Sequence, residues 1–207
     1  MIQPDDHSMA EMRSLETTYL QSEDPIVQSG FSGGRERWVA ERRPLVDGID
    51  RSGDFLDVGC ANGLLVADVC RWAAERGHRL VPYGIDLGSQ LVALARQRHP
   101  DHAHNFQTAD GWSWQPDRSW TFVYSTTHLT QPDMMCEWIQ RLSELVAPGG
   151  RLILGSYGSH SRGIAPDDVA GHLTRCGLEV AGSSNGGDGP ITRFAWADKQ
   201  DEPIPPQ

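Results

Sequence analysis

One glycine-rich segment, residues 57–63, combines a carboxylate with a flexible backbone and reads Asp-Val-Gly-Cys-Ala-Asn-Gly. It lies between a short apolar run that ends at Val58 and a stretch with helical spacing that begins at Leu64. Glycines at such a strand-to-helix turn permit a tight bend and let a ligand approach the backbone closely. Asp57 at the end of the strand would repel a pyrophosphate but attract an ammonium or sulfonium group. We therefore predict a loop that binds a ligand with a positive charge.

The same loop does not fit the dinucleotide-binding fingerprint, which requires G-x-G-x-x-G. Ala61 stands two residues after Gly59, and Leu64 stands three residues after Ala61, so the pattern fails at two positions. A reductase or epimerase with a Tyr-x-x-x-Lys pair is also disfavoured, because Lys199 in the C-terminal tail is the single lysine of the chain. Nicotinamide chemistry is therefore the alternative that a binding measurement must exclude.

Two more carboxylates stand near the ends of later strand-like runs. Asp86 ends the run that starts at Leu80, and it lies 27 residues after Gly59. This spacing suits a carboxylate that accepts hydrogen bonds from ribose hydroxyls. Asp110 precedes Gly111 after a weaker strand signal. Each also has a plain structural interpretation, because Asp86 can cap a helix and an Asp-Gly pair is common in turns.

Residues 57–63 resemble motif I of the class I S-adenosylmethionine-dependent methyltransferases, in which an acidic residue precedes G-x-G-x-G. Ala61 replaces the middle glycine here. The stretch 142–154, with Pro-Gly-Gly near its centre, is similar to the family's segment before and through the fifth strand. The resemblance covers residues 35–197, nearly the whole chain. It implies S-adenosylmethionine as the cofactor and S-adenosylhomocysteine as the product.

The resemblance also implies how the cofactor is held. Asp86 matches the family's acidic residue that binds the ribose hydroxyls, and Leu87 beside it would pack on the adenine. Asp110 would accept a hydrogen bond from the adenine amino group, with Gly111 and Trp112 lining the base. The predicted cofactor-binding residues are Asp57, Gly59, Cys60, Ala61, Gly63, Asp86, Leu87, Asp110, Gly111 and Trp112.

The loop after the fourth predicted strand offers one candidate catalytic residue. It runs from Tyr124 to Thr130 and contains His128, which can be a general base toward a methyl acceptor or an ordinary surface histidine. The loop lacks the [DN]-P-P-[FYW] motif of enzymes that methylate amino nitrogens of nucleic acids. Tyr157, after the fifth strand, is a candidate for lining the acceptor pocket. We predict a small-molecule acceptor and leave open whether oxygen or nitrogen is methylated.

Neither the histidines nor the cysteines predict a metal site. His99, His102 and His104 lie near Asp101, but on a loop away from the strand ends where ligands of such sheets bind. The cysteines have no CxxC spacing, so they predict neither a zinc site nor a disulfide framework and favour a reducing compartment. They are Cys60, Cys70, Cys136 and Cys176.

The composition predicts one folded domain. The chain has 207 residues, 38% of them hydrophobic, and a formal net charge of −10. This charge argues against nucleic acid or an anionic membrane as a partner, because both are polyanions. We see no signal peptide and no apolar run long enough to span a membrane. We therefore expect a cytoplasmic protein with no nucleic-acid or membrane partner.

Strand-like and helix-like segments alternate along the chain, which predicts a parallel sheet with helices on both faces. Helices are expected over 64–76, 90–98 (with Ser89 as its cap), 132–146 and 166–176. A loop rich in Gly, Ser and Asn joins the last two strands, which predicts a hairpin and one antiparallel strand. The predicted strands are 55–58, 80–85, 105–108, 120–124, 151–154, 178–181 and 191–196. The expected fold class is α/β, a Rossmann-like doubly wound seven-stranded sheet.

The predicted organisation has three parts: an N-terminal arm or lid (1–34), the S-adenosylmethionine-binding methyltransferase domain (35–197) and a disordered tail (198–207). Arg35 can pair with the methionine carboxylate of the cofactor or be an exposed helix charge. Because the lid is short, a partner or a second subunit can complete the site. We therefore keep a homodimer among the predictions. The leading hypothesis is a small-molecule methyltransferase. The alternative is a non-catalytic regulatory or partner subunit that binds S-adenosylmethionine on the same fold.

Overall fold

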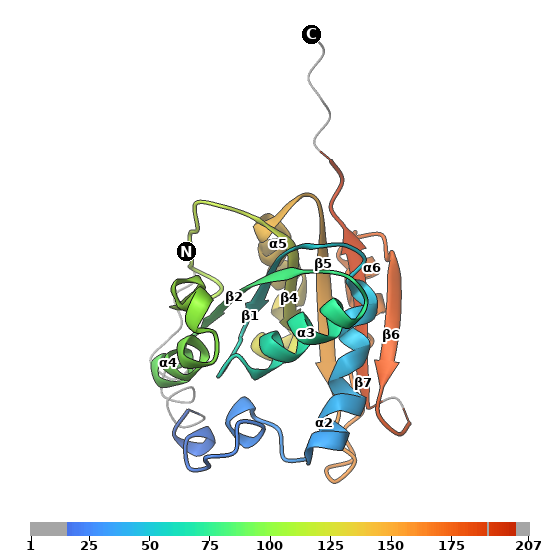
Figure 1. Ribbon diagram of the computed structural model, residues 1–207. Helices are drawn as coiled ribbons and strands as arrows, with labels where there is room; N and C mark the ends of the chain where they lie inside the picture. Colours follow the sequence, from blue (N-terminus) through green and yellow to red (C-terminus); the bar gives the residue numbers. More distant parts are fainter. Residues whose placement is uncertain (1–15, 190, 202–207) are drawn as a thin grey trace.

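Seven strands form one mostly parallel sheet (Figure 1), which confirms the predicted fold class. The computed structural model describes residues 16–189 and 191–201. The strand order is β3-β2-β1-β4-β5-β7-β6; β7 is antiparallel to both of its neighbours, and β1 to β5 are parallel to one another. The bounds are β1 Gly53–Val58, β2 Leu80–Asp86, β3 Phe106–Thr108, β4 Trp120–Thr126, β5 Val146–Tyr157, β6 Gly182–Gly186 and β7 Thr192–Asp198.

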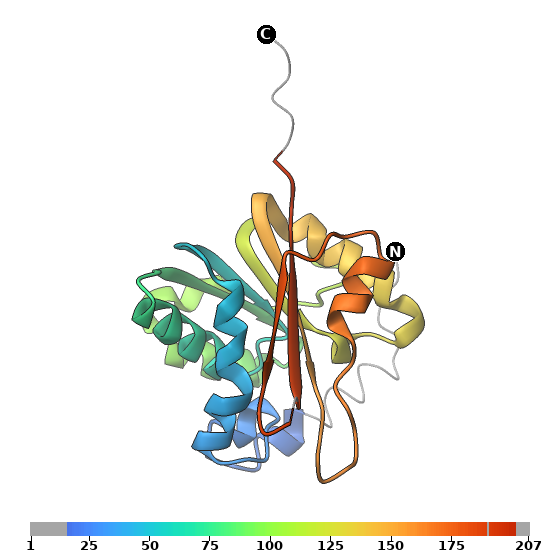
Figure 2. The same ribbon diagram turned by 90° about the vertical axis from the view of Figure 1, so that its right-hand side faces the viewer.

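Helices cover both faces of the sheet (Figure 2). One layer holds α2 (Arg35–Arg42), α3 (Leu64–Glu75) and α4 (Ser89–Arg98), and the other holds α5 (Met135–Leu145) and α6 (Val169–Arg175). Within the described residues, no helix is both long and apolar enough to cross a membrane. Short 3-10 helices connect these elements: η1 Val27–Ser29, η2 Arg43–Gly48, η3 Pro100–Asn105, η4 Thr127–Leu129 and η5 Pro132–Met134.

Successive residues of the central strands enter two different cores, because strand side chains alternate between the faces of a sheet. Phe55 and Phe122 pack in the core beneath α3, whereas Leu56 and Val123 pack in the core beneath α5. All four side chains are fully buried. Each contributes roughly 1.5–3 kcal/mol to folding by leaving water. Burial on both faces explains why these strands read as continuous apolar runs.

The last hairpin differs from the prediction. Residues 178–181 do not form a strand; the Gly-Ser-rich segment after them forms β6 instead, at the edge of the sheet. β6 pairs in an antiparallel register with β7, in which Gly182 lies opposite Trp196. A Cβ at Gly182 would come within 2.5 Å of the Trp196 ring. Pairing and close packing against an aromatic ring therefore override the low strand propensity of this segment.

Two residues of the predicted disordered tail belong to the fold. Asp198 is the last residue of β7, and its carboxylate accepts a 2.7 Å hydrogen bond from Nε of Arg151. Lys199 donates from Nζ to the carbonyl oxygens of Ser143 and Val146 at 3.0 and 2.8 Å. These contacts attach the chain end to α5 and β5. The prediction for residues 202–207 lies outside the described part of the chain.

A disulfide joins the two helices on one face of the sheet, so the prediction that cysteines form no disulfide is wrong. Cys136 on α5 is bonded to Cys176, which follows α6, and their Cα atoms are 5.2 Å apart. The two cysteines are 40 residues apart in sequence. They meet because α5 and α6 pack beside each other, which no local spacing shows. Cys60 and Cys70 are free thiols.

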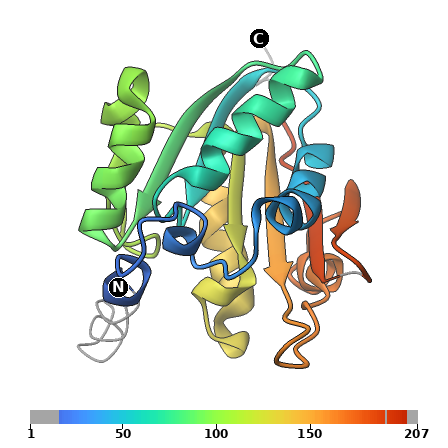
Figure 3. The ribbon, with the colours of Figure 1, turned by 60° about the horizontal axis from the view of Figure 1, so that its bottom comes forward.

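The functional edge of the sheet follows from its topology. The chain proceeds from β1 outward through β2 to β3 and then returns to β4 on the other side of β1, so the strand order reverses there. Ligands of such sheets bind beyond the carboxyl ends of the strands at this reversal. Residues 16–34 run across this edge, between α4 and α2 (Figure 3).

Candidate active site

The glycine-rich loop between β1 and α3 is tied to the end of β2. The backbone N–H groups of Gly59 and Cys60 both donate to the carbonyl oxygen of Ile85, at 2.8 and 3.0 Å. One carboxylate oxygen of Asp86 accepts from the N–H of Ala61 at 2.9 Å, and the other accepts from Gly88 at 2.8 Å. Asp86 therefore holds the loop and its own turn in place, in addition to any role toward a ligand.

Helix α4 braces the other side of the loop. Nε2 of His99 lies 3.0 Å from the carbonyl oxygen of Gly63, and Arg98 donates to the carbonyl oxygen of Asn62. The imidazole of His99 also stacks on Phe106, with ring centroids 4.7 Å apart. His99 is therefore a bracing residue of the loop. In the part of the chain that the structure describes, no three His, Cys, Asp or Glu side chains are placed to hold a metal ion.

The loop has left-handed backbone at three positions. Gly59 and Gly63 have φ values of 93° and 70°, which glycine adopts without cost. Ala61, at the place of the middle glycine, has φ of 44°. A left-handed alanine costs about 1–2 kcal/mol, and strain of this kind persists only where surrounding contacts enforce it. The hydrogen bond from Ala61 to Asp86 is such a contact.

Asp57 places a buried carboxylate beneath this loop without a partner. The residue is 2% exposed, and no hydrogen bond contributes to the shift of its pKa. Burial raises its pKa to about 8, and the charge of nearby Asp86 adds to the shift. A buried carboxyl group in this condition gains most from a cation that enters beside it.

The end of β3 approaches the same loop. The N–H of Ala109 donates to the carbonyl oxygen of Asp86 at 3.0 Å, which brings Asp110 toward the end of β2. Asp110 accepts hydrogen bonds from the N–H of Trp112 and the hydroxyl of Ser113. A Cβ at Gly111 would come within 2.7 Å of the Trp138 ring. These contacts are those of an aspartate that stabilises a turn, which is the structural interpretation of Asp110.

The aromatic rings near this turn form two separate pairs. Trp112 packs on Trp138 with ring centroids 4.8 Å apart, beside Asp110. Trp114 packs on Trp120 with centroids 5.4 Å apart. Trp112 therefore packs away from the pair that Trp114 and Trp120 form. Leu87, the other predicted adenine contact, lies half-buried directly after β2.

The N-terminal segment closes over the glycine-rich loop. Nδ2 of Asn62 donates to the carbonyl oxygen of Pro25 at 2.8 Å. Oε1 of Glu16 accepts from the N–H of Gln90 at 2.8 Å, so Glu16 caps α4 and the predicted cap Ser89 does not. Tyr19 lies beside Asp86, and its pKa is raised by burial and by the Asp86 charge. Glu16 and Tyr19 thus bring the arm against the ends of β2 and α4.

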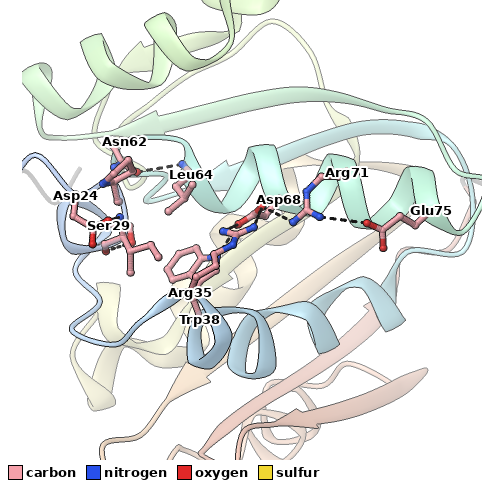
Figure 4. Close-up of polar contacts among 11 residues, drawn as sticks. Asp24, Ser29, Arg35, Trp38, Asn62, Leu64, Asp68, Arg71 and Glu75 are labelled. Atoms are coloured by element: carbon pink, nitrogen blue, oxygen red, sulfur yellow. Dashed lines mark hydrogen bonds and ion pairs between the residues drawn. The ribbon is translucent and has the colours of Figure 1, made fainter.

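Helix α2 is fastened to α3 by a buried carboxylate (Figure 4). Asp68 on α3 accepts two hydrogen bonds from Arg35 at 2.5 and 2.6 Å and one from Nε1 of Trp38 at 2.7 Å. Arg71 adds a third donor group at 2.8 Å. The guanidinium of Arg35 is therefore committed to Asp68. Arg35 is an exposed charge on α2, as one of its two interpretations stated, and it is paired with Asp68.

Tyrosines from β4 and β5 meet next to His128. The hydroxyls of Tyr124 and Tyr157 are hydrogen-bonded to each other. The His128 ring lies parallel to the Tyr157 ring at a centroid distance of 6.2 Å. Burial raises the pKa of both tyrosines above the ordinary value. Both hydroxyls are therefore protonated at neutral pH.

Asp167, just before α6, links the ends of β4 and β5. Its carboxylate accepts hydrogen bonds from the hydroxyls of Thr127 at 2.5 Å and Ser156 at 3.1 Å. Partial burial raises its pKa, but these two hydrogen bonds and the nearby charge of His128 outweigh burial and lower it. Asp167 therefore stays ionised and connects the residues that precede His128 and Tyr157.

Residues 32–182 match the family model described as a methyltransferase domain. This chain belongs to the methyltransferase family. The match covers the glycine-rich loop, the ends of β2 to β5 and most of the helices described above. No curated protein matches the sequence of this chain.

Solved structures resemble this methyltransferase in fold at low sequence identity. The N-methyltransferase NodS from Bradyrhizobium japonicum, bound to S-adenosylhomocysteine, has a TM-score of 0.63 at 18% identity, covering 91% of this chain and 97% of NodS. A Burkholderia thailandensis 1,6-didemethyltoxoflavin-N1-methyltransferase has a TM-score of 0.63 at 18% identity, covering 97% and 93%. The [4+2]-cyclase SpnF has a TM-score of 0.64 at 16% identity, covering 98% of each chain.

S-adenosylmethionine is the cofactor of this methyltransferase. The described residues fit it, because the unpartnered carboxylate of Asp57 lies where a cationic ligand would be stabilised. The predicted residues Gly59, Cys60, Ala61 and Gly63 lie together in the loop tied to Asp86. Their individual contacts with the cofactor stay predictions.

Several residues of the site escaped sequence reasoning. Asn62 lies inside the recognised loop, but its residue type alone did not mark it as functional. Its side chain is fully buried. Glu16, Tyr19 and Asp167 reach the site from segments distant in sequence. Arg42 lies on α2 with its guanidinium 3.7 Å from the centre of the Tyr157 ring. No spacing rule links these residues to the glycine-rich loop of the methyltransferase.

Proposed function

We propose that this enzyme transfers the methyl group of S-adenosylmethionine to a small molecule held beyond the ends of β4 and β5. The unpartnered, buried carboxylate of Asp57 carries the proposal. It offers a site for a cation at the strand reversal, and its charge contributes to the raised pKa of both Tyr124 and Tyr157. A methyl donor at Asp57 would therefore face the tyrosine and histidine side of the edge.

The proposed roles follow from these positions. S-adenosylmethionine supplies an activated methyl group on a sulfonium centre. Asp57 attracts the positive charge, Asp86 and Leu87 hold the adenosine, and Asp110, Gly111 and Trp112 line the base. His128 takes a proton from the acceptor, with the ionised carboxylate of Asp167 nearby to stabilise the positive charge that results. Closure by residues 16–34 excludes water, and positioning supplies much of the remaining rate.

A small-molecule acceptor agrees with several observations. Residues 16–34 run across the functional edge of the sheet, and Asn62 holds this segment at Pro25. The net charge of −10 disfavours nucleic acid as a partner. The relatives NodS and the Burkholderia enzyme are named as N-methyltransferases, and the second is bound to a small heterocycle. We leave oxygen and nitrogen acceptors both open and keep a homodimer as one way to complete the acceptor side. The cytoplasmic location stays a prediction, and the disulfide removes the cysteine argument for it.

Calorimetry and a methyl-transfer screen test the proposal. We expect S-adenosylmethionine and S-adenosylhomocysteine to bind and NADH not to bind. Radiolabelled methyl donor should then label small phenols, carboxylic acids or amines, and His128→Ala should lower turnover without changing cofactor affinity. NADH binding without adenosyl binding would contradict the proposed cofactor site.

Binding of the cofactor without transfer to any acceptor would favour the non-catalytic alternative. The likeness to SpnF shows a different point, because that protein of the same fold is named for a reaction other than methyl transfer. An S-adenosylmethionine-dependent fold therefore does not by itself establish transfer to a given acceptor.

A further inference from the structure

Arg42, the last residue of α2, is a buried cation surrounded by aromatic rings. The residue is 7% exposed. Its guanidinium carbon lies 3.7 Å from the centre of the Tyr157 ring, 4.7 Å from that of Phe31 and 5.2 Å from that of Trp38. Phe31 comes from the N-terminal segment and Tyr157 from the end of β5. The guanidinium is therefore enclosed between the arm and the sheet.

The hydrogen-bonding capacity of Arg42 is mostly unused. Among the described residues, its one hydrogen bond goes from Nη1 to Oε2 of Glu41, at 3.2 Å. The other oxygen of Glu41 accepts from Arg37 at the shorter distance of 2.5 Å. One carboxylate thus serves two guanidinium groups, which leaves a net positive charge in this place. A guanidinium has five N–H donors, so most of those of Arg42 have no acceptor among the described residues.

The position of Arg42 connects the two ends of the site. It faces Tyr157, whose hydroxyl bonds to Tyr124 and whose ring lies parallel to His128. The charge of Asp57 reaches the same two tyrosines. Arg42 and His128 therefore both neighbour the Tyr157 ring, which places Arg42 beside the proposed acceptor side. Arg35, the other arginine considered for a carboxylate, is already paired with Asp68.

We propose that Arg42 is a carboxylate-binding residue of the active site. Its free N–H groups can bind one carboxylate in a bidentate manner, while the rings of Phe31, Trp38 and Tyr157 keep the guanidinium in place. The carboxylate belongs either to the amino-acid end of the cofactor or to the methyl acceptor. The second source rests on the proposed function, because that function defines where the acceptor lies.

Calorimetric titrations of Arg42→Met separate these sources. Methionine keeps an unbranched apolar chain that can pack on the rings but removes the charge. The probes are S-adenosylhomocysteine, 5′-methylthioadenosine (which lacks the amino acid) and benzoate added to protein saturated with S-adenosylhomocysteine. Arg37→Met is the matched control, because Arg37 lies on the same helix and pairs with the same Glu41. Arg42→Lys keeps the charge without the planar fork and serves if the methionine variant does not fold.

We expect Arg42→Met to weaken one carboxylate ligand by roughly 10- to 100-fold and Arg37→Met to leave it within about twofold. A loss for S-adenosylhomocysteine but not for 5′-methylthioadenosine assigns Arg42 to the cofactor. A loss for benzoate alone assigns it to the acceptor. Arg42→Lys should show a smaller loss for the same ligand.

Two results would overturn the subsite. Equal affinities of wild type and Arg42→Met for all three probes would show that the guanidinium only packs against the rings. Equal losses in Arg37→Met and Arg42→Met would assign the effect to the net charge of α2. Failure of the proposed cofactor site is distinct, because wild-type protein would then bind neither adenosyl ligand.

Discussion

At the scale of single residues, the site is defined by carboxylates in three different conditions. Asp57 is buried and unpartnered, Asp86 accepts two backbone hydrogen bonds, and Asp167 is held by two hydroxyls. Burial raises the pKa of the first two, whereas hydrogen bonds outweigh burial at the third. The residue type is the same in each case, so the surroundings decide the role of each carboxylate. Asp57 favours a cation, Asp86 holds backbone N–H groups, and Asp167 stays ionised near His128.

Binding of S-adenosylhomocysteine at pH 7 should release close to one proton from Asp57. The free protein holds this proton because the pKa of Asp57 is about 8, whereas the bound ammonium group favours the ionised form. Affinity should therefore rise with pH, by at most about tenfold per unit, and level off above about pH 8. Titration in phosphate and in Tris at pH 7 measures the release, because the two buffers have different ionisation enthalpies.

Asp57→Asn should abolish both the proton release and the pH dependence of affinity. The same shift predicts the pH dependence of folding: the raised pKa means that the folded state binds more protons than the unfolded state. The contribution of Asp57 to stability is therefore full below about pH 4 and is lost as pH rises toward 8. Identical binding enthalpies in the two buffers would contradict the assigned condition of Asp57.

At the scale of elements, the arm is positioned by a polar contact to the glycine-rich loop, and α2 is positioned by polar contacts to α3. Asn62 binds the arm at Pro25, and Asp68 binds α2 through Arg35 and Trp38 (Figure 4). Both contacts lie within a few residues of the glycine-rich loop. Trp38 and Arg42 lie on α2, and Arg42 contacts the rings of Phe31 and Tyr157. Movement of α2 would therefore change these contacts as well. The cover and the cofactor loop therefore act as one coupled unit.

Asp68→Asn should loosen α2 without unfolding the sheet. It removes the negative charge that three donor groups share, so we expect a loss of about 1–3 kcal/mol in the free energy of unfolding. Urea denaturation measures that loss, and hydrogen exchange should show faster exchange in Arg35–Arg42. Glu75→Gln is the matched control on the same helix, because its ion pairs with Arg43 and Arg71 are exposed and should matter by less than about 0.5 kcal/mol. Equal effects of both variants would argue against Asp68 as the fastening residue.

At the scale of the whole molecule, the two helical layers have different tasks. The layer with α2, α3 and α4 carries the cofactor loop and its cover. The layer with α5 and α6 follows the strands that bear His128 and Tyr157, and the disulfide joins these two helices. The crosslink thus closes a ring of chain that contains β5 and Asp167. The acceptor side is stabilised covalently, whereas the cofactor side is stabilised by polar contacts.

Cys136→Ser should lower the free energy of unfolding by about 2–4 kcal/mol, because it releases a loop of 40 residues in the unfolded chain. Urea denaturation with and without dithiothreitol measures the effect. Reductant should lower the stability of the wild type to that of Cys136→Ser and leave the variant unchanged. Cys70→Ser, at a free thiol, should keep the response of the wild type to reductant. A thiol assay that finds all four cysteines reactive in unfolded, non-reduced protein would show that the bond is absent.

The sequence by itself determined the alternation of strands and helices, the glycine-rich loop and the carboxylates at the ends of β1 and β2. These features are local: hydrophobic periodicity and turn residues act within about ten positions, so they can be read without knowing the fold. The two helical layers and the one antiparallel strand then followed from rules for alternating strands and helices. The same local signals misplaced β6, where pairing with β7 decided the structure.

Tertiary structure alone decided which distant side chains share the site. Arg35 and Arg42 lie seven residues apart on one helix, yet Asp68 neutralises the first and aromatic rings surround the second. The disulfide, the cap from Glu16 on α4 and the contacts of Asp167 likewise join segments tens of residues apart. Charge pairing and burial depend on neighbours in space rather than in sequence. For that reason the sequence predicted the cofactor loop, but it predicted neither the contacts of the segment that covers the loop nor those around His128.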